Sequence, residues 1–415
     1  MAEQISPVLL YILMAGMLVT GTLNTVFLKF MNLAYYTDRE GKSDKQFNHA
    51  FFQTFIMFIG EFLCLGVYGI MYLRDKKKYG DASLNPQAIE AKKRGLKTNI
   101  NVCILAIPAC FDITASTLMF MGLTMIAASI YQMMRGLIVF VAAIFSIIFL
   151  GRRYHRHHWT ALAFVVGGVA IVGASPVIFP NSDDDDDDDA GKMAIVGIIL
   201  VVVAQLFAGG LMISEEKLLG SYYLHPLKVV GWEGFWGCTI YLILLLIFQF
   251  ITCGDKTICP HGRLEDTPQA FYEMGSNPGI LLYGIGSILS IAFFNALGVS
   301  VTKFASAAQR STIDTSRTLL IWGVFLLKPG EGREKFIWLE LVGFVLLVLG
   351  TLVFNEILVI PILGFNKNTK DAIEARKALE DDREDIEDSY NGNMPTKKGK
   401  VAAEKEKLLD TDSEN

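Results

Sequence analysis

The chain has 415 residues, of which 52% are hydrophobic and 19% are charged, and its formal net charge is −5. Soluble domains average about 25% charged residues, so this composition excludes an ordinary soluble globular protein. The slight acidity, together with the lack of a basic patch in any folded soluble part, excludes a nucleic-acid-binding protein.

Hydrophobic residues fall in about ten blocks of roughly 20 residues, the length that a helix needs to cross a bilayer. Lipid offers no partner for backbone polar groups, so each block is predicted to be a helix. The predicted fold class is an all-α polytopic membrane protein, and the first block is a retained helix because no basic residues precede it. The segments are 8–29, 50–73, 100–121, 125–150, 158–179, 193–214, 229–252, 279–301, 305–327 and 336–358.

Basic residues set the predicted orientation. The loops 74–99 and 151–158 are rich in lysine and arginine. The loop with the acidic run Asp183–Asp189 has a single basic residue, Lys192. Basic loops tend to stay in the cytosol, which places the N-terminus there and the acidic run in the lumen. An even number of spans then returns the C-terminus to the cytosol.

Two arginines inside apolar stretches, Arg135 and Arg317, lie 182 residues apart. An arginine at bilayer depth costs roughly 2.5–3.5 kcal/mol on insertion scales, so a matched pair indicates an internal repeat. Alignment on these arginines places Gln132 beside Asp314. Each half then holds five helices, and because five is odd, the second half enters the membrane inverted, as in many secondary transporters.

The repeat predicts four parts of the chain. Residues 1–179 form the first five-helix repeat, and residues 193–358 form the second. Residues 180–192 form an acidic lumenal linker, in which seven adjacent aspartates favour a solvated segment without order. Residues 359–415 form a charged cytosolic tail.

Ten polar residues within the predicted spans are the candidate site. Seven unpaired charges there would cost on the order of 20 kcal/mol, so they must have partners. One account is mutual pairing that holds the bundle together, as Asp314 and Arg317 can do on one helix face. The other is a cavity where the arginines bind a phosphate or carboxylate and the carboxylates gate or carry a proton. The residues are Glu61, Asp112, Arg135, Glu233, Arg310, Asp314, Arg317, Asn24, Gln132 and Asn295.

Several motifs carry a family resemblance: Met57–Phe62, Tyr131–Gly136, Phe149–Arg153, Val230–Gly234, Ser290–Asn295 and Asp314–Thr318. With them the chain resembles the drug/metabolite transporter superfamily and, within it, the F branch of solute carrier family 35, a family best known for nucleotide-sugar transporters. The resemblance covers the membrane domain and fails at the poly-aspartate loop and most of the tail. It implies two inverted halves of five helices and a lysosomal location, and it says little about the solute.

The predicted function is secondary transport of a small anionic organic solute by alternating access, with a nucleotide-like compound as one option. The sequence has no ATP-binding loop and no catalytic motif, so neither ATP hydrolysis nor enzymatic activity is expected. No cofactor or metal is expected, because the histidines in 155–158 are interpreted as a basic loop at the headgroups. Glu215 is interpreted as a marker of the membrane interface. The alternative is a non-transporting scaffold or receptor that acts through its cytosolic tail.

Two further features lie outside the spans. Cys253 and Cys259 share a loop on the predicted lumenal side, where they either form a disulfide or remain two separate thiols. In the tail, Glu404, Leu408 and Leu409 resemble the sorting signal that clathrin adaptors bind, in agreement with the lysosomal location that the family resemblance implies. The sequence does not predict the oligomeric state.

Overall fold

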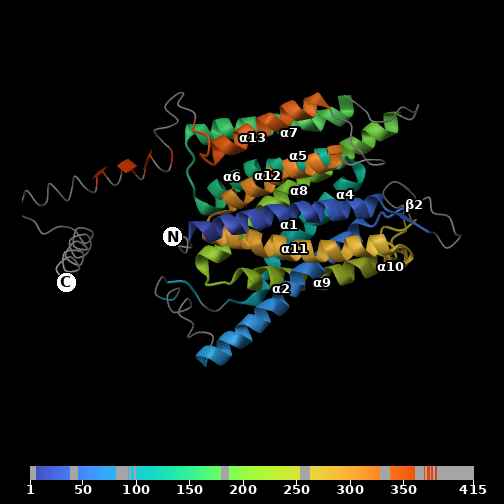
Figure 1. Ribbon diagram of the computed structural model, residues 1–415, viewed down its shortest axis with the longest axis horizontal. Coiled ribbons are helices and arrows are strands. Elements are labelled where there is room, and N and C mark those ends of the chain that lie inside the picture. The colour runs from blue at the N-terminus through green and yellow to red at the C-terminus, as the bar shows by residue number, and fades with distance from the viewer. Residues whose placement is uncertain are drawn as a thin grey trace, which may run out of the picture.

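Figure 1 shows the computed structural model as a bundle of long helices that lie side by side. The structure describes residues 6–37, 45–80, 100–178, 187–252, 262–327 and 337–359, with isolated positions between 92 and 97 and between 369 and 380. Within these residues, the regular structure is helical apart from one pair of two-residue strands and two isolated bridges.

The helices follow the predicted segments in chain order. Those of the N-terminal half are α1 (Pro7–Leu33), α2 (Ala50–Tyr79), η2 (Val102–Leu105), α4 (Ala106–Met125), α5 (Ala128–Met134), η3 (Arg135–Leu137), α6 (Ile138–Leu150) and α7 (Arg156–Ile178). Those of the C-terminal half are α8 (Asp187–Ser221), α9 (Pro226–Phe248), α10 (Thr267–Ser276), α11 (Pro278–Phe304), α12 (Ala307–Leu327) and α13 (Trp338–Phe354). The strands β1 (Tyr35–Tyr36) and β2 (Lys45–Gln46) pair antiparallel between α1 and α2.

Three of these helices start with the same local signal. A side chain that accepts a hydrogen bond from the first turn is followed by proline at the first helical position, where the missing N–H is not needed. The pairs are Ser6-Pro7, His225-Pro226 and Asn277-Pro278.

Within the part of the chain that the structure describes, eight helical stretches are long and apolar enough to cross a membrane. The prediction of a polytopic, mostly helical membrane protein is therefore confirmed. The predicted segments 305–327 and 336–358 fall on α12 and α13, which are not among the eight. α13 is apolar but has only 17 residues, and α12 carries Arg310, Asp314 and Arg317. The count of ten spans stays a prediction.

The fourth predicted segment, 125–150, is not one continuous helix. α5 ends at Met134, and the single 3-10 turn η3 separates it from α6. Arg135 stands at this break. Gly136 follows it and leaves no space for a side chain, because Leu347 of α13 packs against its Cα. A 3-10 turn inside a helix often marks a functional position.

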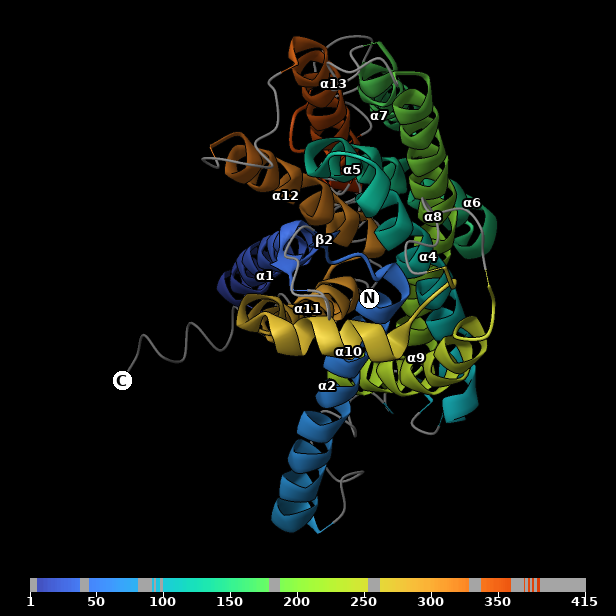
Figure 2. The same ribbon diagram turned by 90° about the vertical axis from the view of Figure 1, so that its right-hand side faces the viewer.

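The most extensive helix packing joins the two halves: α1 with α11, α2 with α9, α4 with α8, and α7 with α13. Figures 1 and 2 both show α7 and α13 side by side at one edge of the bundle. Gly234 of α9 packs on the backbone of Glu61 and Phe62, and Gly168 of α7 packs on the backbone of Gly343. Small residues at such interfaces are how membrane helices approach closely.

All four of these helix pairs are antiparallel. Gly231 near the start of α9 packs against Leu65, whereas Gly237, one and a half turns later, packs against Phe58. The order of contacts is likewise reversed between the partners in the other three pairs.

Two segments differ from the expected layout. α8 begins at Asp187, inside the predicted acidic linker, and aspartates are favourable in a first helical turn because they oppose the helix dipole. The loop between α9 and α11 contains the short helix α10, which no predicted segment covered. The domain boundaries themselves stay predictions.

Candidate functional site

α12 carries three buried charged residues on one face. Arg310, Asp314 and Arg317 are four and three residues apart, so they are neighbours along the helix surface. Their exposed fractions are 4%, 4% and 2%. Two groups of charged side chains meet this face. The arginine cluster comprises Arg135, Asp314 and Arg317, and the carboxyl cluster comprises Glu61, Asp112, Glu215, Glu233 and Arg310.

Asp314 is the shared partner of both arginines in the arginine cluster. Arg135 Nη2 donates to Asp314 Oδ2 at 3.0 Å, and Arg317 Nη2 lies 3.0 Å from Asp314 Oδ1. The predicted pairing of Asp314 with Arg317 is therefore present. One carboxylate between two guanidinium groups leaves one positive charge in excess. The Arg135 side chain is 16% exposed, against 2% for Arg317, so Arg135 is the more accessible cation.

Aromatic rings and close helix packing hold the two guanidinium groups. The guanidinium carbon of Arg317 lies 4.7 Å from the ring centre of Phe294, and that of Arg135 lies 5.7 Å from Tyr131. Such cation–π contacts stabilise desolvated cations. Gly21 of α1 faces the same group, and a Cβ there would lie 2.7 Å from Phe294 and closer still to Arg317.

The uncharged candidates fall into two environments. Gln132 of α5 donates to Thr25 at 3.1 Å, and its backbone oxygen accepts from Thr318 at 3.3 Å, so it borders the arginine cluster. Asn24 accepts hydrogen bonds from Ser287 and Ser290 at 3.0 and 3.3 Å. Asn24 thus links α1 to α11 at their packing interface.

The carboxyl cluster draws its acids from α2, α4, α8 and α9. The side chain of Asn295 donates to Glu61, and Ser116 donates to Asp112 at 2.8 Å. Glu233 lies within electrostatic range of the other three acids and of Arg310. The four acids are between 1% and 8% exposed.

Glu215 is the cluster residue that the sequence placed elsewhere. It was expected at the membrane interface, but it is 1% exposed and forms an ion pair with Arg310 of α12. The two residues are 95 positions apart, so no local pattern predicts the pair. The signal available in the sequence was indirect: an arginine within a span requires a nearby acid.

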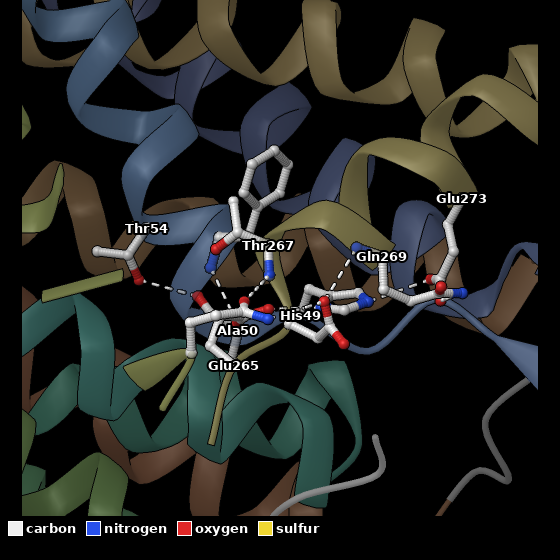
Figure 3. Close-up of polar contacts among 10 residues, drawn as sticks. His49, Ala50, Thr54, Glu265, Thr267, Gln269 and Glu273 are labelled. Atoms are coloured by element: carbon white, nitrogen blue, oxygen red, sulfur yellow. Dashed lines mark hydrogen bonds and ion pairs between the residues drawn. The ribbon is translucent and has the colours of Figure 1, made fainter. Parts of the chain in front are cut away.

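Besides these two clusters, a group of polar side chains around His49 lies outside the predicted spans, where α10 packs on the start of α2 (Figure 3). His49 Nδ1 lies 2.5 Å from Glu265 Oε1, and His49 Nε2 lies 3.3 Å from Glu273 Oε2. Glu265 also accepts from the backbone N–H of Phe52 at 3.3 Å, which places a carboxylate at the N-terminus of α2. No pattern in the sequence indicates this histidine–carboxylate group, because its members are far apart in the chain.

The position of His49 between two acids sets its protonation. Burial alone lowers the pKa of His49, but hydrogen bonds and negative charge from Glu265 and Glu273 outweigh burial and raise that pKa to about 9. His49 is therefore a cation at neutral pH, and it ties the start of α2 to α10.

A third group joins the start of α7 to the end of α13. His157 Nε2 and His158 Nε2 lie 3.1 and 3.5 Å from Glu356 Oε1. The three ligand atoms lie within 4.8 Å of one another, a spacing that can hold a metal ion. Both histidines are buried in the first turn of α7, although the sequence placed them in a headgroup loop. The expectation of no metal stays a prediction.

Several predicted residues lie outside the described part of the chain. They are the cysteines of the expected disulfide and the residues of the tail sorting signal: Cys253, Cys259, Glu404, Leu408 and Leu409. The other four cysteines, all within the described residues, are free thiols.

Comparison with known proteins gives matches along most of the chain. A family model for "Nucleotide-sugar transporter" matches residues 9–224, a range that contains Arg135 and Glu215. Solute carrier family 35 member F6 of Homo sapiens is 35% identical over 348 residues, which are 84% of this chain and 89% of that protein. An uncharacterized protein of Schizosaccharomyces pombe is 32% identical over 346 residues, 83% of this chain and 97% of that one.

A shorter match involves a relative named for its solutes. The UDP-N-acetylglucosamine/UDP-N-acetylgalactosamine transporter nstp-4 of Caenorhabditis elegans is 37% identical over 68 residues, 16% of this chain and 20% of that protein. The family model and the long matches agree with the buried charges on a polytopic helical bundle. The chain belongs to solute carrier family 35, in its F branch, and is a multi-pass membrane transporter and not an enzyme.

Proposed function

We propose that this transporter carries a small anionic organic solute and recognises it with the arginine cluster. The observation that carries the proposal is the charge balance of that cluster, in which Asp314 is shared by Arg135 and Arg317. A buried cation in excess requires a counter-anion. Planar guanidinium groups bind phosphate and carboxylate through two parallel hydrogen bonds, which suits an anionic solute.

The proposed transport cycle is alternating access between two inverted five-helix halves, without ATP hydrolysis. With α5, η3 and α6 counted as one span, exchanging the halves converts the α1–α11 packing into the α8–α4 packing. The α2–α9 and α7–α13 pairs map onto themselves, and all four pairs are antiparallel. This symmetry supports inverted repeats, in which the solute site lies at the repeat interface. Arg135 and Arg317 come from equivalent spans of the two halves.

The proposed solute class is a nucleotide-sugar-like phosphate ester. The family model and the name of the nematode relative point to such solutes in related proteins. A diphosphate offers oxygens to both guanidinium groups, so it can replace Asp314 as their shared partner. Solute that replaces Asp314 would break the ion pair between α12 and η3. Solute binding would therefore favour a different arrangement of the two halves.

The proposed sidedness follows the basic residues. Lys76, Lys77 and Lys78 lie in the last turn of α2, and Arg152 and Arg153 follow the end of α6, so we place these ends and both chain termini in the cytosol. Figure 2 shows this end of α2 extending beyond the other helices. A lysosomal location, with the tail bound by clathrin adaptors, is part of the same proposal.

A ligand screen by thermal unfolding tests this proposal. Purified protein is heated with UDP-N-acetylglucosamine, UDP or UMP, and with neutral N-acetylglucosamine as the matched control. A ligand that binds only the folded state raises the melting temperature, and the rise grows with the logarithm of the ligand concentration above its dissociation constant. We expect stabilisation by the phosphate-bearing compounds and none by the neutral sugar.

Two variants locate the binding. Arg135→Gln should abolish the ligand-induced rise in melting temperature. Arg152→Gln should retain it, because Arg152 is a partly exposed arginine just after α6 that pairs with Glu216 of α8. Equal stabilisation of both variants, or stabilisation by the neutral sugar alone, would refute the arginine cluster as the anion site.

A further inference from the structure

The carboxyl cluster contains more acid than its cations can balance. Arg310 is its one guanidinium among the described residues, and four acids face it from α2, α4, α8 and α9. If every group were ionised, three negative charges would remain in excess inside the bundle. An isolated ionised carboxylate in a low-dielectric interior costs many kcal/mol, and such a group takes up a proton instead.

The hydrogen bonds of the cluster show where protons are needed. The ion pair with Arg310 satisfies Glu215, and Asn295 and Ser116 donate to Glu61 and Asp112, respectively. Among the described residues these are the donors to the four acids, and one ionised carboxylate cannot donate to another because it only accepts. The described residues provide no donor for Glu61 Oε2 or for Glu233 Oε1, although both atoms are buried.

Glu61 and Asp112 provide an independent geometric sign. Their carboxyl groups lie within hydrogen-bonding range of each other. Two carboxyl groups can share a hydrogen bond only when one of them carries the proton. Paired acids of this kind titrate as a unit, with one proton shared between them over a wide pH range.

We infer that the carboxyl cluster is a proton-binding site, with one proton shared by Glu61 and Asp112 and another held by Glu233, and that solute transport is coupled to these protons. The coupling rests on the proposed function; proton binding itself does not. The groups that face the cluster are Glu61 and Cys64 of α2, Asp112 of α4, Glu215 of α8, Glu233, Cys238 and Tyr241 of α9, Asn295 of α11 and Arg310 of α12.

α12 connects the proton site to the solute site. Arg310 belongs to the carboxyl cluster, and Asp314, one turn later, belongs to the arginine cluster. Protonation reduces the negative charge that attracts Arg310, and solute releases Asp314 from its two arginines. Both ligands therefore act on the position of one helix, and each changes the affinity for the other by the same factor. Protons would bind from the acidic side and leave on the alkaline side.

Infrared spectroscopy of the reconstituted protein tests the proton site without any solute. Protonated carboxyl groups have a C=O stretching band that carboxylates lack, and the band is recorded as pH is raised. We expect the wild type to show this band at neutral pH and lose it in alkaline buffer. Glu61→Gln and Glu233→Gln should each remove part of it. Glu216→Gln, the next residue of α8, which pairs with Arg152 outside the cluster, should leave it unchanged.

A variant that does not fold is recognised by size-exclusion chromatography, and the other cluster variant is then decisive. If the wild type shows no protonated-carboxyl band at neutral pH, or if both cluster variants match Glu216→Gln, the proton site is refuted.

A second measurement tests the coupling. Proteoliposomes that contain a pH-sensitive dye receive UDP-N-acetylglucosamine outside, and proton and solute entry are recorded together. We expect wild-type protein to move protons with solute, and Glu233→Gln to lose about half of the proton movement per solute carried, because the proton shared by Glu61 and Asp112 remains. An unchanged ratio in Glu233→Gln overturns the coupling. If no solute enters at all, the proposed solute class fails while the infrared result still decides the proton site.

Discussion

The arginine cluster and the carboxyl cluster meet the same face of α12, but the ratio of cations to acids is opposite in the two. Asp314 is one acid shared by two cations, and each of its oxygens lies 3.0 Å from a guanidinium nitrogen. Around Arg310 the ratio is reversed, with four acids and one cation. One region therefore lacks an anion and the other lacks protons, and we propose a transported anion and a coupled proton as the corresponding ligands.

The largest expected effect contrasts two isosteric amide substitutions. Asp314→Asn leaves two buried arginines without a carboxylate, and loss of one partner of a buried ion pair costs about 3–5 kcal/mol of unfolding free energy. Glu233→Gln removes an acid that lacks a cation of its own, so it should leave stability unchanged or raise it. Thermal unfolding in detergent at neutral pH measures both. A similar loss in both variants would contradict the difference between the clusters.

His49 provides a third arrangement, one cation between Glu265 and Glu273, and its effect depends on pH. The pKa of His49 is about 9 in the folded protein, against the ordinary value of 6.5 that holds for the unfolded chain. Its contribution, roughly 3 kcal/mol, is fully present below pH 6.5 and is lost as pH rises through about 9. We expect the wild-type melting temperature to fall over this range, and that of His49→Gln to be lower at neutral pH and to fall less. His155→Gln, at an exposed position, is the control. Equal pH profiles of the melting temperature for His49→Gln and wild type would show that the His49 ion pairs do not stabilise the fold.

The packing around Arg317 gives an intermediate effect. A Cβ at Gly21 would meet Phe294 and Arg317, whereas one at Gly66 would meet no atom within 4 Å. Both glycines are helical, so an alanine gains the same helix propensity at each site and the comparison isolates the steric term. Gly21→Ala should lose about 1–3 kcal/mol relative to Gly66→Ala. Equal unfolding temperatures of Gly21→Ala and Gly66→Ala would show that α1 does not pack closely against the guanidinium group of Arg317.

The smallest effect is expected outside both clusters. Arg152 pairs with Glu216, and its side chain is 35% exposed. Exposed ion pairs contribute about 0–1 kcal/mol, so Arg152→Gln should change thermal stability little. A loss as large as that in Asp314→Asn would show that burial does not determine the importance of a charge in this bundle.

The sequence predicted those parts of the molecule that depend on local pattern. Apolar blocks predicted the helices, and three-residue spacing predicted the contact between Asp314 and Arg317. The matched arginines, Arg135 and Arg317, share one carboxylate in the structure, and their role in solute binding stays a prediction. The break at Arg135 was not predicted, because apolar residues continue through it on both sides.

The missed contacts join residues that are far apart in the chain. Glu215 meets Arg310 across 95 residues, and His49 meets Glu265 across 216. A glutamate at the end of an apolar block, such as Glu215, is interpreted as the end of a membrane span unless its cationic partner is known. These pairings depend on how α8 packs beside α12 and how α10 packs on α2, and local sequence patterns do not reveal such long-range packing.

The most direct test of the central claim is uptake of radiolabelled UDP-N-acetylglucosamine into proteoliposomes by three folded proteins: wild type, Arg135→Gln with Arg317→Gln, and Arg152→Gln. We expect saturable uptake by the wild type and by Arg152→Gln, and none by the double variant. Uptake by the double variant at the wild-type rate would contradict the claim that these two buried arginines bind the solute.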